Sequence, residues 1–227
     1  MRALRIIMGG LVALGVGAIL ACCVAYPTYT HRYRLTVEVD VDGQVTSGSS
    51  VIETHWTAQP AGLVGGKPFS VRVFGEAVYV DLGSRGPLIV TLFGDNIRER
   101  ASTSRSAHEL ALVAFGLRRD HAGLDALQRR RGRVELPIEA LPLLITFTDV
   151  RDPRTIRAFT PAEVPSVFGP DVQLRSASVE LTDAPMSRSL ADALPWLRAM
   201  TPSTLIGRLE GGRHPTFYAI GLIGDSQ

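Results

Sequence analysis

A run of 21 uncharged residues from Ile6 to Tyr26 constrains this chain more than any other feature of its sequence. Arg2 and Arg5 precede the run. An α-helix rises about 1.5 Å per residue, so about 20 such residues cross the hydrocarbon core of a bilayer. We therefore predict that residues 1–27 direct the chain to a membrane and that residues 28–227 form one exported domain.

The sequence leaves three alternatives for this leader. As a signal anchor it spans the membrane once, with Arg2 and Arg5 on the cytoplasmic side. As a cleavable signal peptide it offers small residues at 23–25 as a cleavage site. As a lipoprotein signal it ends in Ala21-Cys22, which resembles a lipobox and makes Cys22 a candidate for lipidation. All three alternatives place the bulk of the chain outside the cytoplasm.

The composition of the exported part excludes several kinds of binding site and cross-link. The formal net charge of +2 is too close to zero to indicate a nucleic-acid partner. Both cysteines lie in the leader, so the exported part has no disulfide and no cysteine-ligated metal. The five histidines never fall three or four residues apart, which excludes a helical histidine pair for a metal. We expect no cofactor and no metal.

The residue pattern predicts short strands. Alternating apolar and polar residues from Tyr33 to Val39, followed by Asp42-Gly43, predict a β-hairpin that returns over residues 45–56. A second hairpin is expected at residues 69–82, turning at Gly75-Glu76. Residues 141–147 are the most apolar strand outside the leader, and we expect this strand to be central.

Helices are expected at residues 106–119 and 124–130, in a short segment that starts at Thr160, and at residues 187–200. The fold class that follows is α+β, preceded by one N-terminal membrane helix. The expected domain combines a mostly antiparallel sheet of about seven or eight strands with three or four short helices.

Asp149 and Asp152 are the strongest candidates for acid–base chemistry, because they follow an apolar strand directly. His55 or His121, brought close by folding, would complete such a site. The competing interpretation is that Asp152, which precedes Pro153, only forms a turn. The sequence has no phosphate-binding loop, no dinucleotide fingerprint, no HExxH and no GxSxG motif.

The most basic segment contains Arg129, Arg130, Arg131 and Arg133. Guanidinium groups at these positions can contact the phosphates of anionic lipid headgroups. The alternative interpretation is a solvated helix end, whose cations offset the helix dipole.

Four stretches carry a resemblance to a known family: residues 33–39, 47–53, 143–147 and 194–197. They resemble an uncharacterised proteobacterial family of short membrane-associated or lipoprotein-like proteins. The resemblance implies association with a bacterial membrane and assigns no catalytic residue. Together with the export that the leader predicts, it places the bulk of the chain at the periplasmic face. We therefore expect a non-enzymatic binding or structural module of the cell envelope. The alternative is a hydrolase-like enzyme with a site near Asp149 and Asp152.

Overall fold

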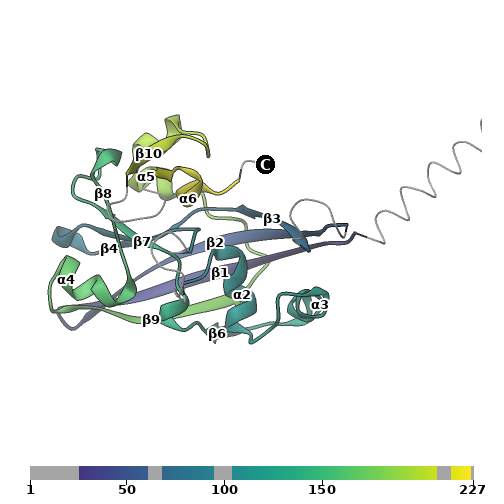
Figure 1. Ribbon diagram of the computed structural model, residues 1–227. Coiled ribbons are helices and arrows are strands. Elements are labelled where there is room, and N and C mark those ends of the chain that lie inside the picture. Colours follow the sequence, from purple (N-terminus) through teal and green to yellow (C-terminus); the bar gives the residue numbers. More distant parts are fainter. Residues whose placement is uncertain (1–25, 61–67, 95–103, 209–215, 226–227) are drawn as a thin grey trace, which may run out of the picture. The chain divides into compact units, whose positions relative to one another are not determined.

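The computed structural model describes residues 26–60, 68–94, 104–208 and 216–225 (Figure 1). The chain divides into two compact units. The smaller takes its described residues from Met1–Tyr29 and His55–Val71, and the larger from Thr30–Thr54 and Arg72–Gln227. The predicted membrane helix, apart from Tyr26, and the candidate lipidation site Cys22 lie outside the described residues. Within the described ranges, no helix is both long and apolar enough to cross a bilayer.

The predicted first hairpin is confirmed. It consists of β1 (Thr28–Val41) and β2 (Gln44–Ala58). Asp42 and Gly43 adopt φ angles of 54° and 81°, as a two-residue turn of this kind requires. The Gly43 amide donates a 2.8 Å hydrogen bond to Asp40 Oδ1, which fixes the turn.

The strands form two main antiparallel sheets. The first has the order β3-β2-β1-β9-β6, with β3 (Phe69–Phe74), β6 (Arg133–Glu135) and β9 (Val172–Leu181). The second has the order β4-β5-β7-β8, with β4 (Val78–Asp81), β5 (Pro87–Val90), β7 (Leu144–Phe147) and β8 (Ile156–Phe159). The predicted α+β class with antiparallel pairing is therefore confirmed, whereas the prediction of one sheet of seven or eight strands is wrong.

The second predicted hairpin is also wrong, because β3 and β4 belong to different sheets. Gly75, at φ 111°, lies between them and lets the chain leave the first sheet. The two sheets approach closely at Gly48 of β2. A Cβ atom there would lie 2.1 Å from the Tyr79 carbonyl oxygen of β4, so only glycine fits.

The described part contains five α-helices: α2 (Ala107–Ala114), α3 (His121–Arg129), α4 (Val164–Phe168), α5 (Leu190–Ala193) and α6 (Ile220–Ile223). The helix expected at residues 106–119 ends early, because Gly116 has a φ of 62°. The helix expected at residues 187–200 is divided. Pro195 starts a separate 3₁₀ turn, η5 (Pro195–Ala199), since proline cannot continue the hydrogen-bond ladder of α5.

The remaining elements are short. They are the strands β10 (Leu205–Arg208) and β11 (Thr216–Tyr218) and the 3₁₀ turns η1 (Gly83–Arg85), η2 (Ile138–Ala140), η3 (Pro153–Thr155) and η4 (Pro161–Glu163). The predicted helix start at Thr160 is confirmed by a capping box with Glu163.

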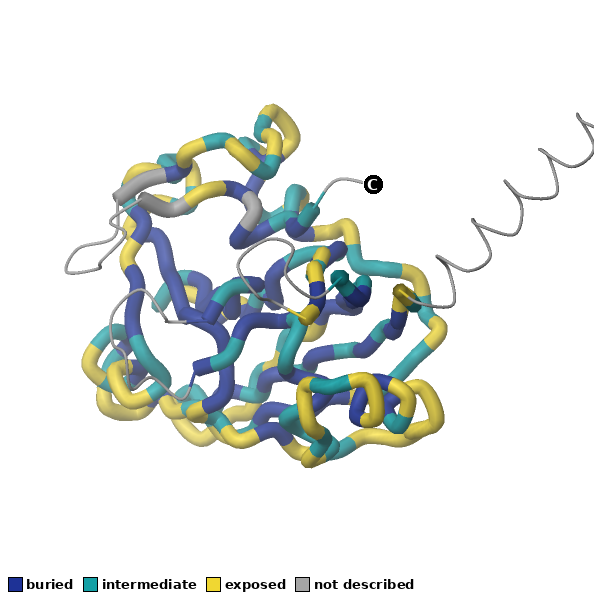
Figure 2. Tube along the Cα trace, turned by 45° about the vertical axis from the view of Figure 1, so that its right-hand side comes forward, coloured by how far each residue is buried: buried dark blue, intermediate teal, exposed yellow. Residues whose placement is uncertain are grey.

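One apolar cluster joins the second sheet to the C-terminal elements. Its members from the sheet include Ile89, Ile145 and Phe147, and its C-terminal members include Leu194 and Leu222. Figure 2 shows that buried residues follow the strands, while exposed residues gather on turns and helix surfaces. The strand predicted to be central is confirmed as such, because β7 lies between β5 and β8 with all four residues buried.

Candidate functional site

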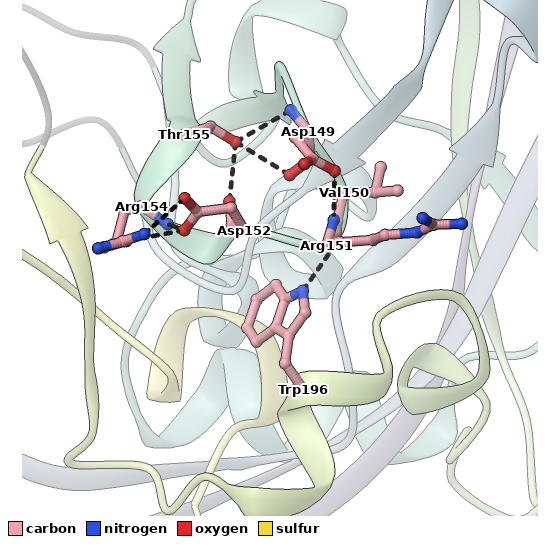
Figure 3. A network of polar contacts seen from close by, with 7 residues as sticks. All are labelled: Asp149, Val150, Arg151, Asp152, Arg154, Thr155 and Trp196. Carbon is pink, nitrogen blue, oxygen red and sulfur yellow. Dashed lines mark hydrogen bonds and ion pairs between the residues drawn. The ribbon is translucent and has the colours of Figure 1, made fainter.

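The two carboxylates proposed for catalysis form the turn between β7 and β8 (Figure 3). Asp149 Oδ1 accepts a 2.9 Å hydrogen bond from the Arg151 amide. Asp152 Oδ1 accepts a 3.0 Å bond from the Arg154 amide, and both Asp152 oxygens accept from the Arg154 guanidinium. The hydrogen bonds from Arg154 lower the pKa of Asp152 below its usual value. Such a carboxylate is a poor proton donor near neutral pH.

Thr155 and Trp196 complete this turn. Thr155 Oγ1 bonds the backbone of both Asp149 and Asp152, and Trp196 Nε1 donates a 2.8 Å bond to the Val150 carbonyl (Figure 3). The interactions recorded for the two aspartate side chains are thus local to the turn.

The candidate histidines lie on other elements. His121 is exposed at the start of α3, and His55 lies on β2 in the smaller unit. No cavity described below is lined by Asp149, Asp152 or His121. The described residues contain no group of three or more histidine, cysteine, aspartate or glutamate residues placed to hold a metal ion.

Three cavities of the larger unit lie instead along residues 182–189, which we call the strap and which connect β9 to α5. At its start, Arg32 Nη1 donates to the carbonyls of Asp183 and Ala184, at 3.3 and 3.0 Å. Near its end, Ser187 exchanges two hydrogen bonds with the backbone of Val51. The strap is therefore fastened to β1 and β2 at separate points.

An ion pair between the half-buried Arg32 and the buried Glu53 anchors the start of the strap. Glu53 is only 7% exposed, and its Oε2 accepts from both Nε, at 2.9 Å, and Nη2 of Arg32. The same guanidinium thus neutralises a buried carboxylate and holds the strap. Beside it, the His31 ring Nε2 and the Thr54 hydroxyl form a 2.7 Å hydrogen bond.

Two cavities of about 270 and 150 Å³ adjoin at the end of the strap, since Glu76 and Ser187 line both. We call this pair of cavities the strap groove. Hydroxyl-bearing side chains dominate the smaller cavity: Ser49, Ser50, Tyr79, Ser187 and Ser189. Phe74, Arg188 and Asp225 line the larger one. The groove thus presents many groups that both donate and accept hydrogen bonds.

Glu76 links the two sides of the strap groove through hydrogen bonds. Its Oε2 accepts a 2.9 Å bond from the Leu190 amide at the start of α5, and its carbonyl accepts a 2.6 Å bond from Ser50 Oγ. Burial raises the pKa of Glu76 above its usual value, despite the amide bonds that lower it. Burial also raises the pKa of Tyr79, and the Asp81 carboxylate adds to that effect. Both groups therefore hold their protons over a wider pH range than in water.

Sequence reasoning missed most of this groove. The sequence pattern places Glu76 in a hairpin turn and Ser187 at the start of a helix. Only the serine cluster of β2, which supplies Ser49 and Ser50, is visible as an unusual local pattern. No local signal joins Glu76 to Ser187, because they meet only after the chain has crossed between the sheets.

The four arginines of the basic segment separate into two groups. Arg133 belongs to the first sheet, where its Nε donates a 2.8 Å bond to Ser178 Oγ and its Nη2 lies 3.8 Å from Glu38 Oε1. Arg129, Arg130 and Arg131 are exposed at the end of α3. Arg131 also lines a third cavity, of about 180 Å³, at the start of the strap.

A scan against protein-family models and searches of curated proteins and of solved structures found no match for this chain. The family resemblance drawn from the sequence therefore stays a prediction.

Proposed function

We propose that this chain is a membrane-tethered, non-enzymatic binding module at the periplasmic face of a bacterial membrane, with the strap groove as its ligand site. In this proposal the leader, residues 1–27, is a single membrane helix or a lipid anchor on Cys22. The observation that carries the binding role is the pair of cavities that share Glu76 and Ser187, the smaller of which is lined mainly by hydroxyl-bearing side chains.

Three observations favour binding over the hydrolase alternative. Among the residues that the structure describes, the lining of the strap groove contains serines but no histidine or lysine, the usual groups that activate a serine nucleophile. Glu76, the carboxylate shared by the linings of both cavities, already accepts from the amide that begins α5. At the alternative site, Asp149 and Asp152 accept hydrogen bonds within their own turn.

The ligand class follows from the lining. Serine and tyrosine hydroxyls both donate and accept, so they match a ligand whose own groups do the same. The charges in the groove are mixed, with Arg188 beside Glu76 and Asp225, and so they favour a neutral ligand. We propose an uncharged oligosaccharide rich in hydroxyl and acetamido groups.

Replacing Tyr79 by phenylalanine tests the ligand site, since it removes one hydroxyl and keeps the ring. Loss of one hydrogen bond between neutral groups should weaken binding by about two- to twelvefold. The measurement is a calorimetric titration of the detergent-solubilised full chain with a tetrasaccharide of N-acetylglucosamine. Tyr218→Phe, at an exposed tyrosine outside the groove lining, is the matched control. Equal affinity in both variants, or no binding by the unaltered chain, would contradict the proposed ligand site.

A reporter fused after Gln227 tests the tether. We expect activity from a reporter that works only outside the cytoplasm, because Arg2 and Arg5 precede the apolar run. Activity of a cytoplasm-only reporter would exclude this topology.

The substitution Cys22→Ala distinguishes a lipid anchor from a membrane helix. In a lipoprotein it abolishes labelling by fatty acid, whereas in a signal anchor it leaves membrane association unchanged.

A further inference from the structure

The third cavity, at the start of the strap, lies beside the cationic end of α3. Some exposed arginines elsewhere in the larger unit face acidic partners, as in the pairs Arg118–Asp120 and Arg119–Glu109. Within the described ranges, Arg129, Arg130 and Arg131 form no such pair. The end of α3 is therefore a local excess of positive charge next to a cavity.

Arg131 brings that charge into the cavity lining. Its Nη1 donates to the carbonyls of Gln128 and Arg130, at 3.0 and 2.7 Å, and so offsets the negative end of the helix. Within the described part of the chain, the hydrogens on Nε and Nη2 donate to no acceptor. These hydrogens form the planar fork that fits two oxygens of a phosphate group.

The other polar residues of the cavity lining favour a bound anion, except for the carboxylate of Asp183. Thr30 and Gln128 add side-chain donors, and the charge of Arg32 is already balanced by Glu53. Asp183 also lines the cavity, and its carboxylate opposes an anion there. Neutralising Asp183 should therefore strengthen anion binding, whereas neutralising Arg131 should weaken it.

The position of the cavity in the chain indicates where the anion comes from. Thr30 lines the cavity and follows Tyr26, the last residue of the apolar run, by only four residues. Four residues of extended chain span at most about 14 Å. If the run is a membrane tether, as the proposed function holds, this cavity lies at the level of the lipid headgroups.

We propose that the cavity lined by Arg131, Gln128 and Thr30 binds the phosphate group of an anionic lipid headgroup. Arg129 and Arg130 add attraction to the same surface without entering the cavity lining. The lipid source rests on the proposed tether, whereas the anion site rests only on the cavity and its arginine.

The test uses the full chain in an uncharged detergent and titrates it with short-chain phosphatidylglycerol, with short-chain phosphatidylcholine and with inorganic phosphate. Binding is followed by calorimetry and by hydrogen exchange at residues 127–131 and 181–183. We expect phosphatidylglycerol to bind most tightly. Arg131→Gln should weaken its binding about fivefold, because one arginine near an anionic surface contributes about 1 kcal/mol. Asp183→Asn should strengthen its binding.

Arg151→Gln, at an exposed arginine in the turn between β7 and β8, is the matched control and should leave binding unchanged. Equal effects of Arg131→Gln and Arg151→Gln, or weaker binding in Asp183→Asn, would overturn the anion site. Inorganic phosphate binding as tightly as phosphatidylglycerol would overturn the lipid assignment. Because detergent replaces the bilayer, these outcomes are independent of the reporter assay that tests the tether.

Discussion

Replacing Arg32 by methionine should lower the free energy of unfolding by about 3 kcal/mol, the lower end of the cost of leaving a buried charge without its partner, because Arg32 itself is half-buried. Glu53 would stay buried, with its side chain only 9% exposed, and would lose the guanidinium that neutralises it. The two hydrogen bonds from Arg32 to the strap would be lost as well. Urea denaturation of the detergent-solubilised chain at neutral pH measures the change.

The double variant Arg32→Met/Glu53→Leu is the control for this prediction. It removes the buried carboxylate together with its partner, so no unpaired charge remains. Apolar replacement of a buried pair is often close to neutral, and the double variant should therefore recover most of the lost stability. If the losses from Arg32→Met and Glu53→Leu simply add in the double variant, the two side chains are not coupled and the ion pair does not anchor the strap.

This ion pair could be predicted from the sequence, because it follows from the register of the first hairpin. A two-residue turn at Asp42-Gly43 places Val41 opposite Gln44. Counting back along both strands then places Arg32 opposite Glu53, the pair that the hydrogen bonds join. The same register places His31 opposite Thr54, which are also bonded. Local turn chemistry therefore determines pairs of residues more than twenty positions apart.

The division into two sheets could not be predicted in the same way. The segment at Gly75-Glu76 has the composition of a tight turn, and local preference alone favours a hairpin. The strand at Val78 pairs instead with Val90 in the second sheet, where the strands are shorter and the two inner strands, β5 and β7, are fully buried. Packing between the two sheets determines which strand the segment at Val78 pairs with, and no local sequence pattern indicates that packing.

The strap groove escaped prediction for the same reason. Its defining contacts join the loop at Glu76 with Leu190, which are 114 residues apart in the chain. The aspartates at 149 and 152, by contrast, were conspicuous because they lie close together in sequence. Their closeness reflects a turn, in which each aspartate accepts from the backbone amide two residues ahead.

Phe147→Ala should lower the free energy of unfolding by about 3–5 kcal/mol, through lost burial and the cavity that remains. Phe147 is 4% exposed on β7, the strand between β5 and β8. Its ring meets the Trp196 ring edge to face, with centroids 5.5 Å apart, and so joins the second sheet to η5. A loss of this size is a large share of the about 5–15 kcal/mol that stabilises a typical domain.

Urea denaturation and fluorescence quenching distinguish loss of the Phe147–Trp196 contact from a nonspecific loss of stability. Phe147→Leu keeps most of the buried volume, so it should cost clearly less than Phe147→Ala in the same urea titration. Val45→Ala, at an exposed side chain near the hairpin turn, should leave the midpoint almost unchanged. Phe147→Ala also removes the ring beside Trp196, so the indole should become more accessible to a fluorescence quencher even below the unfolding transition. An unchanged midpoint in Phe147→Ala would show that the junction between β7 and η5 does not hold the C-terminal elements on the second sheet.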